Sequence, residues 1–372
     1  MKRFLTAAAE GRDWRTATNA CLDALGETPP EANLGFVYVT DRLADELGAI
    51  VRLLRTASGV AEWVGTVGVG ICLDDREYYD SPAVGIMVAT FPEDAFRVFP
   101  TLDTDLANLV DNFKPWYSQD EQHFAVVHGD PRSGTTPDQI PLLAETVPRA
   151  YLVGGLTSSQ TGYAQYANGL CEGGLSGVLF SGEVPVAASL TQGCSPIGRP
   201  HRITESRRNV IMGLDGRPAL DVFKEDIGEV LARDISRVAG YIFVGLPADG
   251  PDLSDYVVRN LLGVDSRSGQ LMIGDLVRPG QSVLFCRRDG PSAWDNLNRM
   301  VRSLRRRADA PIRGALYFSC LGRGRQLFGE GSAELKTIQR ELGNVPLAGF
   351  FANGEIARGR LYGYTGVLAL FL

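Results

Sequence analysis

The sequence predicts an α/β protein of two lobes, whose mixed sheets are built from repeated β-α-β-β units with helices packed on the sheets. A strand-like run, a helical pattern and two further strand-like runs occur in this order three times. A glycine falls at a similar place after each helical pattern. The last two strands of each unit are close enough in sequence to form a hairpin, which argues against purely parallel sheets.

The clearest unit fills the last sixty residues. Residues 314–320 form an apolar, strand-like run, and Leu335, Ile338 and Leu342 then recur at helical spacing. Ser332 is a suitable N-cap for this helix, and Gly343 is a suitable stop. Two more apolar runs, 346–352 and 364–371, complete a strand, helix, strand, strand unit.

Two earlier copies follow the same order. The first has strand-like runs at 34–39, 63–71 and 83–88, with a helix whose apolar face is Leu43, Leu47, Ile50 and Leu54. The second has strand-like runs at 124–128, 151–159 and 175–180, with a weaker helix near 140–146. In this register Gly65, Gly154 and Gly349 are equivalent, and so are Gly85, Gly177 and Gly366. Glycine weakens a strand unless a bulge or a close backbone approach requires it, so a shared backbone feature is expected.

The chain outside these copies gives the predicted domain limits. Residues 1–29 are expected to form a lead-in helix around 14–25, residues 30–205 an N-terminal domain and residues 206–372 a C-terminal domain. A short amphipathic helix is expected from about Asp103. In the C-terminal domain, Asp215-Gly216 predicts a hairpin turn and Pro218 opens a helix. These elements suggest a fourth, looser copy after residue 209.

Composition and charge exclude several classes of protein. With 44% apolar and 22% charged residues the chain has the composition of an ordinary globular protein, and no apolar run is long enough to span a bilayer. The N-terminal apolar stretch meets Glu10, Arg12 and Asp13 too soon for a signal peptide, so a cytoplasmic protein is expected. A net charge of −7 offers no general attraction to nucleic acid. The six cysteines and three histidines lack metal-ligand spacing, so neither structural zinc nor another cofactor is expected.

The strongest candidate site is the polar bend Asn353-Gly354-Glu355 between two apolar strands. Its carboxylate is expected to hold an ammonium group, while Asn353 and backbone groups bind a carboxylate. Arg323 follows a strand within a glycine-rich turn, where a guanidinium can grip an anion in bidentate fashion. Cys320 belongs to the same turn and is expected to line the site. The alternative for both groups is a solvated surface loop.

Four further residues complete the candidate ligand-binding set. Ser158 lies in the polar bend of the second copy, and His128 ends a strand. Cys194 and Ser195 belong to a polar, glycine-punctuated loop, where sites are often built. If the lobes pack through the bends, these groups are expected to converge on one cleft. No residue is assigned a catalytic role, because Cys194 lacks an evident orienting partner.

The sequence resembles the FIST family over nearly its whole length. The resemblance is carried by Gly349 to Ile356 with Gly363-x-Thr365-Gly366, by Ser319-Cys320-x-Gly322-Arg323-Gly324, by Leu214 to Leu220, by Gly174 to Gly182 and by Leu190 to Gly198. It implies an N-terminal and a C-terminal FIST domain that bind a small ligand, such as an amino acid or a derivative, and act in signal transduction through a separate signalling protein. The apolar Gly68-Val69-Gly70-Ile71 segment departs from the polar turn of the family, which argues against a site in the first copy.

Two other functions stay open from the sequence. One is a cysteine-dependent amidohydrolase or transferase that uses Cys194 and His201. The other is a scaffold that binds a segment of another protein in an exposed apolar groove.

Overall fold

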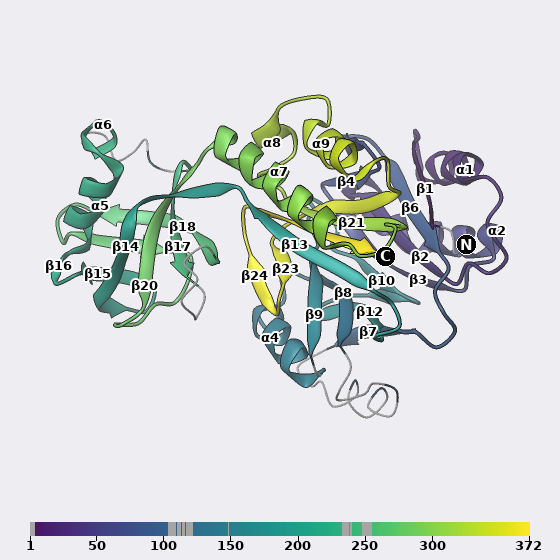
Figure 1. Cartoon of the computed structure of the whole chain (residues 1–372), viewed down its shortest axis with the longest axis horizontal. Coiled ribbons are helices and arrows are strands. Elements are labelled where there is room, and N and C mark those ends of the chain that lie inside the picture. The colour runs from purple at the N-terminus through teal and green to yellow at the C-terminus, as the bar shows by residue number, and fades with distance from the viewer. Residues whose placement is uncertain are drawn as a thin grey trace. The chain divides into compact units, whose positions relative to one another are not determined.

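The computed structural model describes residues 4–102, 109, 113, 116, 122–147, 149–232, 238, 240–247 and 255–372 (Figure 1). The chain forms two compact units, of which the first contains Met1–Thr191 with Leu297–Leu372 and the second Gln192–Asn296. All three predicted copies lie in the first unit, so this division differs from the predicted boundary near residue 205. The helix expected from about Asp103 falls outside the continuously described residues.

The three copies have the same strand order in three separate sheets. The first copy is β2 (Leu34–Thr40), α2 (Leu47–Ser58), β3 (Glu62–Gly68) and β6 (Ala83–Ala89). The second is β8 (His123–Gly129), α4 (Thr136–Thr146), β9 (Ala150–Leu156) and β12 (Leu175–Phe180). The third is β21 (Gly314–Cys320), α9 (Ala333–Leu342), β22 (Leu347–Ala352) and β25 (Thr365–Phe371). In each copy the first strand lies in the centre, parallel to the second and antiparallel to the last.

Each copy contributes a hairpin that pairs with a strand of another copy. The hairpin of β4 (Gly70–Leu73) and β5 (Arg76–Tyr79) leaves the first copy and pairs with β22 of the third. The hairpin of β10 (Gln165–Ala167) and β11 (Leu170–Cys171) leaves the second copy and pairs with β3 of the first. The hairpin of β23 (Glu355–Ala357) and β24 (Arg360–Tyr362) leaves the third copy and pairs with β9 of the second. The exchange is cyclic, so the three sheets are locked into one unit.

One set of aligned glycines is equivalent in space, and the reason is steric. At Gly65, Gly154 and Gly349 an added Cβ would lie 1.7, 1.8 and 1.7 Å from the carbonyl oxygen of the residue opposite on the central strand. No side chain fits at such distances, so the close approach of the two backbones requires glycine. The prediction of a repeat is confirmed by this shared feature and by the common strand order.

The second set of glycines is not equivalent, and here the prediction is wrong. In the first copy Gly85 lies opposite Tyr38, one residue after the partner of Gly65. In the second copy Gly177 lies opposite Val127, which is also the partner of Gly154. In the third copy Gly366 lies opposite Ser319, two residues after the partner of Gly349. Each meets a different obstacle, namely Leu73, the carbonyl of Val126 and the hydroxyl of Tyr317. Their alignment in sequence therefore reflects separate local causes.

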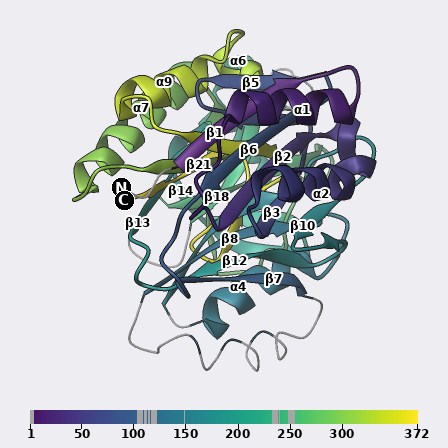
Figure 2. The same cartoon turned by 90° about the vertical axis from the view of Figure 1, so that its right-hand side faces the viewer.

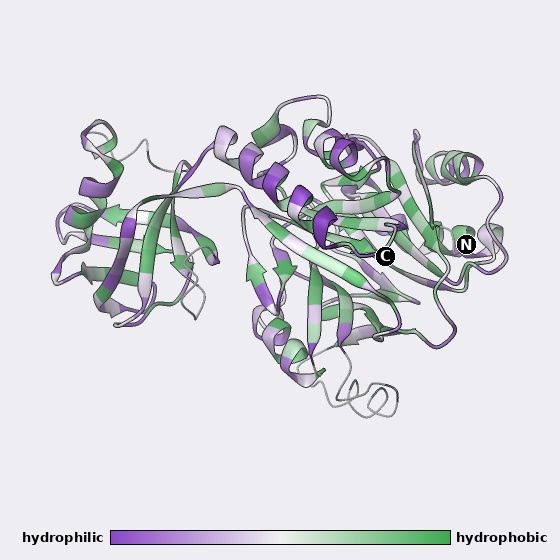
Figure 3. Cartoon of the chain, in the orientation of Figure 1, coloured by the Kyte–Doolittle hydropathy of each residue, from purple (hydrophilic) through white to green (hydrophobic). Residues whose placement is uncertain are grey.

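Helices cover the outer face of each sheet. The lead-in helix α1 (Trp14–Leu25) and α2 pack on the first sheet through an apolar cluster, and α4 packs on the second. Figure 2 shows α1 and α2 side by side over β2, β3 and β6. On the third sheet α9 and α7 (Gly290–Arg307) lie over β21, and their hydrophilic faces are visible in Figure 3. The strand β1 (Phe4–Glu10), which the sequence did not predict, pairs with β6, so residues 1–29 contribute more than a helix.

Each sheet also has an outer strand beside its closing strand. Besides β1, these are β7 (Phe96–Leu102) next to β12 and β13 (Val186–Gln192) next to β25. Equivalent residues of the three central strands, Tyr38, His128 and Phe318, form a ring cluster with centroids 5.7 to 6.4 Å apart. This buried cluster marks the centre about which the three copies are arranged.

The second unit is an antiparallel barrel, so the expected fourth copy is absent from its described residues. The ring runs through β14 (Cys194–Arg207), β20 (Ser282–Arg288), β17 (Ile242–Pro247), β18 (Tyr256–Asp265), β19 (Gln270–Ile273) and β15 (Val210–Leu214), and β15 pairs with β14 to close it. The predicted turn at Asp215-Gly216 joins β15 to β16 (Arg217–Pro218), and both turn residues have positive φ. The helices α5 (Ala219–Ile227) and α6 (Glu229–Ala232) follow, with Leu220 and Phe223 of α5 in the barrel core.

Candidate functional site

The polar bends of the second and third copies meet at the carboxyl ends of the parallel strands. The amide of Asn353 donates to the carbonyl of Leu156 at 2.9 Å, and the amide of Leu156 donates to the carbonyl of Gly354 at 2.9 Å. The first copy reaches the same place, because the amide of Ser158 donates to the carbonyl of Val67 at 3.4 Å. Loops at the carboxyl ends of parallel strands are the usual location of ligand sites in α/β folds.

Ser158 joins all three copies. Its hydroxyl donates to the carbonyl of Phe351 in the third copy and accepts from the amide of Val69 in the first at 2.9 Å. The side chain is fully buried. Ser158 therefore holds the bends together beneath the surface and does not face solvent directly.

Glu355 is also buried, and this changes the role expected from the sequence. Its Oε2 accepts from the amide of Thr365 at 3.0 Å and from its hydroxyl at 2.8 Å, whereas Oε1 is buried without a hydrogen-bond partner. Burial raises the pKa of Glu355 to about 8, against the opposing effect of the Thr365 hydrogen bonds. The raised pKa favours the uncharged carboxyl group, whereas the role expected from the sequence requires a carboxylate that holds an ammonium group. Asn353 is exposed and Gly354 half-buried in the same bend.

Arg323 forms a buried ion pair. Its Nε and Nη2 donate to Oε1 of Glu334 at 2.9 and 2.6 Å, and its guanidinium lies 5.0 Å from the ring centre of Phe328. Glu334 also accepts from the hydroxyls of Tyr317 and Ser319. Arg323 is fully buried, and its Nη1 has no hydrogen-bond partner. The arginine ties α9 to the end of β21 and is not the solvated group of a surface loop.

Cys320 and His128 are buried close to these groups. Burial is the main cause that raises the pKa of the Cys320 thiol. His128 donates to or accepts from the Tyr38 hydroxyl through Nε2 at 3.3 Å, and burial lowers its pKa to about 3. A neutral imidazole within an aromatic cluster supports the core of the first unit. Neither residue is open to solvent.

Cys194 and Ser195 belong to the other unit. They begin β14 and lie opposite Arg288 and Arg287 of β20, so they form part of the barrel and not of a loop. His201, on the same strand, hydrogen-bonds Asp215 through Nδ1 and Asp226 through Nε2, both at 2.8 Å. Because two carboxylates occupy both ring nitrogens, His201 is not placed to serve as a base for Cys194.

A pocket of about 250 Å³ opens beside the converging bends. Its lining residues come from the first and second copies and are Asp41, Arg42, Val69, Asp80, Gln160 and Thr161. Oδ2 of Asp41 accepts from the amide of Gln160 at 3.0 Å, which connects the two copies across the pocket. Oδ2 of Asp80 accepts from Nη1 of Arg325 at 2.6 Å. The lining residue Val69 is linked to Ser158, because its amide donates to the Ser158 hydroxyl.

The charges around this pocket have both signs. Asp41 and Asp80 supply carboxylates, and the Arg325 hydrogen bond holds the pKa of Asp80 below its ordinary value. Arg42 lines the pocket and is exposed, and Arg325 is stacked 4.4 Å from the ring centre of Tyr79. Sequence reasoning missed these residues. Their position in the sequence could have identified them, because Asp41 and Val69 each follow the carboxyl end of a parallel strand.

The described residues contain no group of three or more histidine, cysteine or acidic side chains arranged for a metal ion. All six cysteines are buried, and no disulfide joins any two of them. Among the helices in the described part of the chain, none is long and apolar enough to cross a membrane.

Comparison with known proteins finds relatives along almost the whole chain. Residues 33–217 match the FIST N domain and residues 219–358 match the FIST C domain. The uncharacterized protein Rv0628c of Mycobacterium tuberculosis (strain ATCC 25618 / H37Rv) is 31% identical over 379 residues, which cover 98% of this chain and 96% of that protein. The uncharacterized protein Mb0898c of Mycobacterium bovis is 30% identical over 387 residues, with 98% and 94% covered. The junction of the two matched domains, at 217–219, falls within the barrel unit.

Proposed function

Because the chain belongs to the FIST family, whose domains are associated with ligand binding and signal transduction, we propose that it is a cytoplasmic sensory protein for a small ligand. The ligand is a zwitterion, such as an amino acid or a derivative. A separate signalling protein reads the bound state, and neither nucleic acid nor a membrane takes part.

One observation carries this proposal. The pocket at the converging bends has two carboxylates, Asp41 and Asp80, and two guanidinium groups, Arg42 and Arg325, in or beside its wall. Carboxylates suit the ammonium group of a zwitterion, and guanidinium groups suit its carboxylate. Since the pocket is formed by two copies, a ligand that bridges them also changes the free energy of their contact. That coupling gives a binding event a means of altering the protein as a whole.

Glu355, Arg323 and Ser158 support this pocket from below in the proposal. Glu355 anchors the start of β25 through Thr365, and Arg323 anchors α9 through Glu334. Arg325, two residues after Arg323, donates a hydrogen bond to the pocket residue Asp80. The buried groups therefore position the turn that presents Arg325. The alternative of a cysteine-dependent enzyme lacks such support, because both ring nitrogens of His201 already bind carboxylates.

The first test identifies the ligand directly. Mass spectrometry of small molecules released from the purified, denatured protein should reveal an amino acid or a related zwitterion. Isothermal titration calorimetry with the common amino acids should then show binding by the full chain. A protein that releases no zwitterion and binds none of them would contradict the proposal.

The second test locates the site. Asp80→Asn should weaken binding of the identified zwitterion by about tenfold or more, since a charge-assisted hydrogen bond contributes about 1.5–3 kcal/mol. Asp75→Asn is the matched control, because Asp75 is exposed in the same β4–β5 hairpin but does not line the pocket. Equal affinities for Asp80→Asn and the unchanged protein would place the ligand elsewhere.

A further inference from the structure

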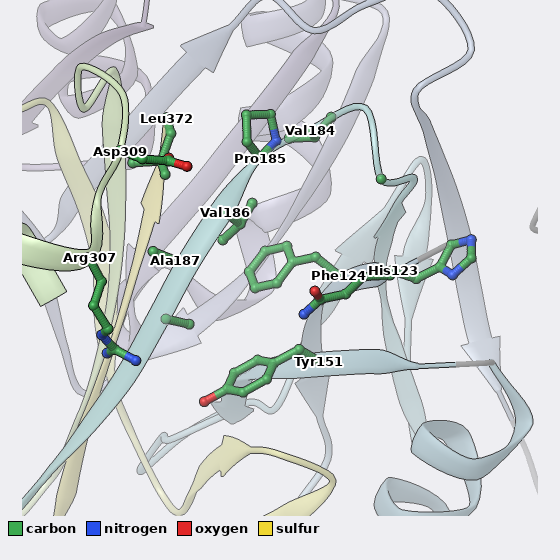
Figure 4. Close-up of a pocket in the computed structure, with 13 residues that line it drawn as sticks. His123, Phe124, Tyr151, Val184, Pro185, Val186, Ala187, Arg307, Asp309 and Leu372 are labelled. Atoms are coloured by element: carbon green, nitrogen blue, oxygen red, sulfur yellow. The ribbon is translucent and has the colours of Figure 1, made fainter. Parts of the chain in front are cut away.

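A second cavity of about 460 Å³ lies at the opposite ends of the same strands (Figure 4). His123 and Phe124 begin β8, and Tyr151 stands near the start of β9, so the cavity is at the amino ends of this parallel pair. Ser158 and the proposed zwitterion pocket follow the carboxyl end of β9. The two pockets share no lining residue.

One side of this cavity is apolar. Val184, Pro185, Val186 and Ala187 form one side along β13 and the turn before it, and the ring of Phe124 faces them (Figure 4). Phe124 is buried, and the β13 residues Val186 and Ala187 are half-buried. Small-molecule sites commonly enclose about 300–1,000 Å³ between apolar walls with a few polar groups. This cavity has a volume in that range and apolar side chains along one side.

The polar groups place a positive charge at one end. Arg307, the last residue of α7, extends beside Ala187 toward the end of the cavity where the Tyr151 hydroxyl lies (Figure 4). The described residues give Arg307 no ion pair and no hydrogen bond, whereas Arg302 in the same helix is paired with Glu341. The Tyr151 hydroxyl accepts from Nε of Arg358 at 3.4 Å, which leaves its own proton available for an acceptor.

A negative charge stands at the other end. Asp309 lies beside Leu372 and Pro185, away from the Tyr151 hydroxyl (Figure 4). Gln122 adds an amide to the lining. A ligand with one anionic group therefore fits in one orientation, and a second anionic group near Asp309 is repelled.

We propose that this cavity binds a monocarboxylate with an aromatic or branched apolar body. The carboxylate lies on the Arg307 guanidinium and the Tyr151 hydroxyl, and the body packs against Phe124, Pro185 and Val186. A charged end and an apolar body are both required, because the lining offers one guanidinium group and one apolar side. The site is separate from the zwitterion pocket and does not depend on the function proposed for it.

The test uses calorimetric titration of the full chain with 4-phenylbutyrate, 4-phenylbutyramide and butyrate. The acid should bind, and the amide and butyrate should each bind about tenfold or more weakly, since the first lacks the charge and the second lacks the ring. Arg307→Gln should weaken binding of the acid by about tenfold or more. Arg306→Gln is the matched control, because Arg306 is exposed beside Arg307 in α7 but does not line the cavity.

A third variant tests the location by volume. Ala187→Trp places a large ring at the cavity wall and should abolish binding of 4-phenylbutyrate, while circular dichroism confirms that the protein is folded. Absence of binding by the acid would overturn the proposal. Equal affinity for acid and amide, equal effects of the two arginine variants, or full affinity in folded Ala187→Trp would each overturn it as well.

Discussion

Two ion pairs, one in each unit, differ in burial. In the first unit the side chains of Arg323 and Glu334 are 0% and 1% exposed, and hydroxyls of Tyr317 and Ser319 complete the shell of the carboxylate. In the barrel, Arg217 and Glu225 form a similar pair with side chains 50% and 62% exposed. The two buried charges are thus stabilised by each other, whereas the two exposed charges are stabilised largely by water. Burial, and not the presence of a pair, decides how much each contributes to folding.

The intermediate case lies on the barrel wall. His201 is 4% exposed and bridges Asp215 and Asp226, whose side chains are 25% and 14% exposed. These groups keep part of their hydration, so their removal should have effects between those of the two arginine pairs. Three changes sharpen this comparison.

The largest effect is expected from Arg323→Met. The substitution leaves the Glu334 carboxylate buried without its cation and should destabilise the first unit by about 3–5 kcal/mol. Hydrogen exchange followed by mass spectrometry should show faster exchange in peptides from β21 and α9. Arg217→Met is the matched control and should change stability by about 1 kcal/mol or less, because its pair is exposed. Similar losses in both variants would contradict the link between burial and stability.

A smaller, pH-dependent effect is expected at Glu355. Burial raises the pKa of this carboxyl in the folded protein to about 8, above its ordinary value of 4.5, so the folded state retains a proton that the unfolded state loses. The resulting stability is fully present below pH 4.5 and is lost as pH rises through about 8. In Glu355→Gln this loss between pH 6 and pH 9 should disappear, because the amide does not ionise. Thermal unfolding across that range measures it, and an unchanged pH profile in the variant would exclude a protonated Glu355.

The smallest effect is expected at Asp215 in the barrel. Hydrogen bonds from the Arg202 amide and from His201 lower the pKa of Asp215 to about 2, against an ordinary value of 3.8. Its contribution is therefore present above pH 3.8 and is lost as pH falls through about 2. Asp215→Asn should be less stable than the unchanged protein at pH 6, and the difference should shrink toward pH 2. Hydrogen exchange of β14 and β15 peptides follows this change, and a constant difference would contradict it.

The local elements could be predicted well from the sequence because short-range rules govern them. The helix at 14–25 and the strand at 314–320 have the predicted bounds, and Gly59 and Gly343 end their helices in the left-handed conformation. Ser332 occupies the predicted N-cap position of α9, but its hydroxyl accepts from the amide of Glu77 and does not cap the helix. A contact 255 residues away in sequence overrides the local rule there.

The candidate site could be predicted only in part. The convergence of the bends at Ser158 and Asn353 agrees with the expectation from the repeat. The pocket residues Asp41 and Asp80 were missed because the apolar segment Gly68-Val69-Gly70-Ile71 argued against a site in the first copy. Asp80 follows the hairpin that this segment begins. Cys194 and Ser195 were grouped with the site, although they belong to the barrel.

The sequence by itself determined the three β-α-β-β copies and the glycines at 65, 154 and 349. Apolar periodicity, capping residues and the position of a glycine in a strand all depend on residues that are close in sequence. Only the tertiary structure decided that the copies exchange hairpins and that the segment Gln192–Asn296 closes into a barrel. It also decided that Glu355 and Arg323 are buried. Hairpin exchange, barrel closure and burial depend on pairings between distant segments, and these are selected by the free energy of the whole fold, not by local spacing.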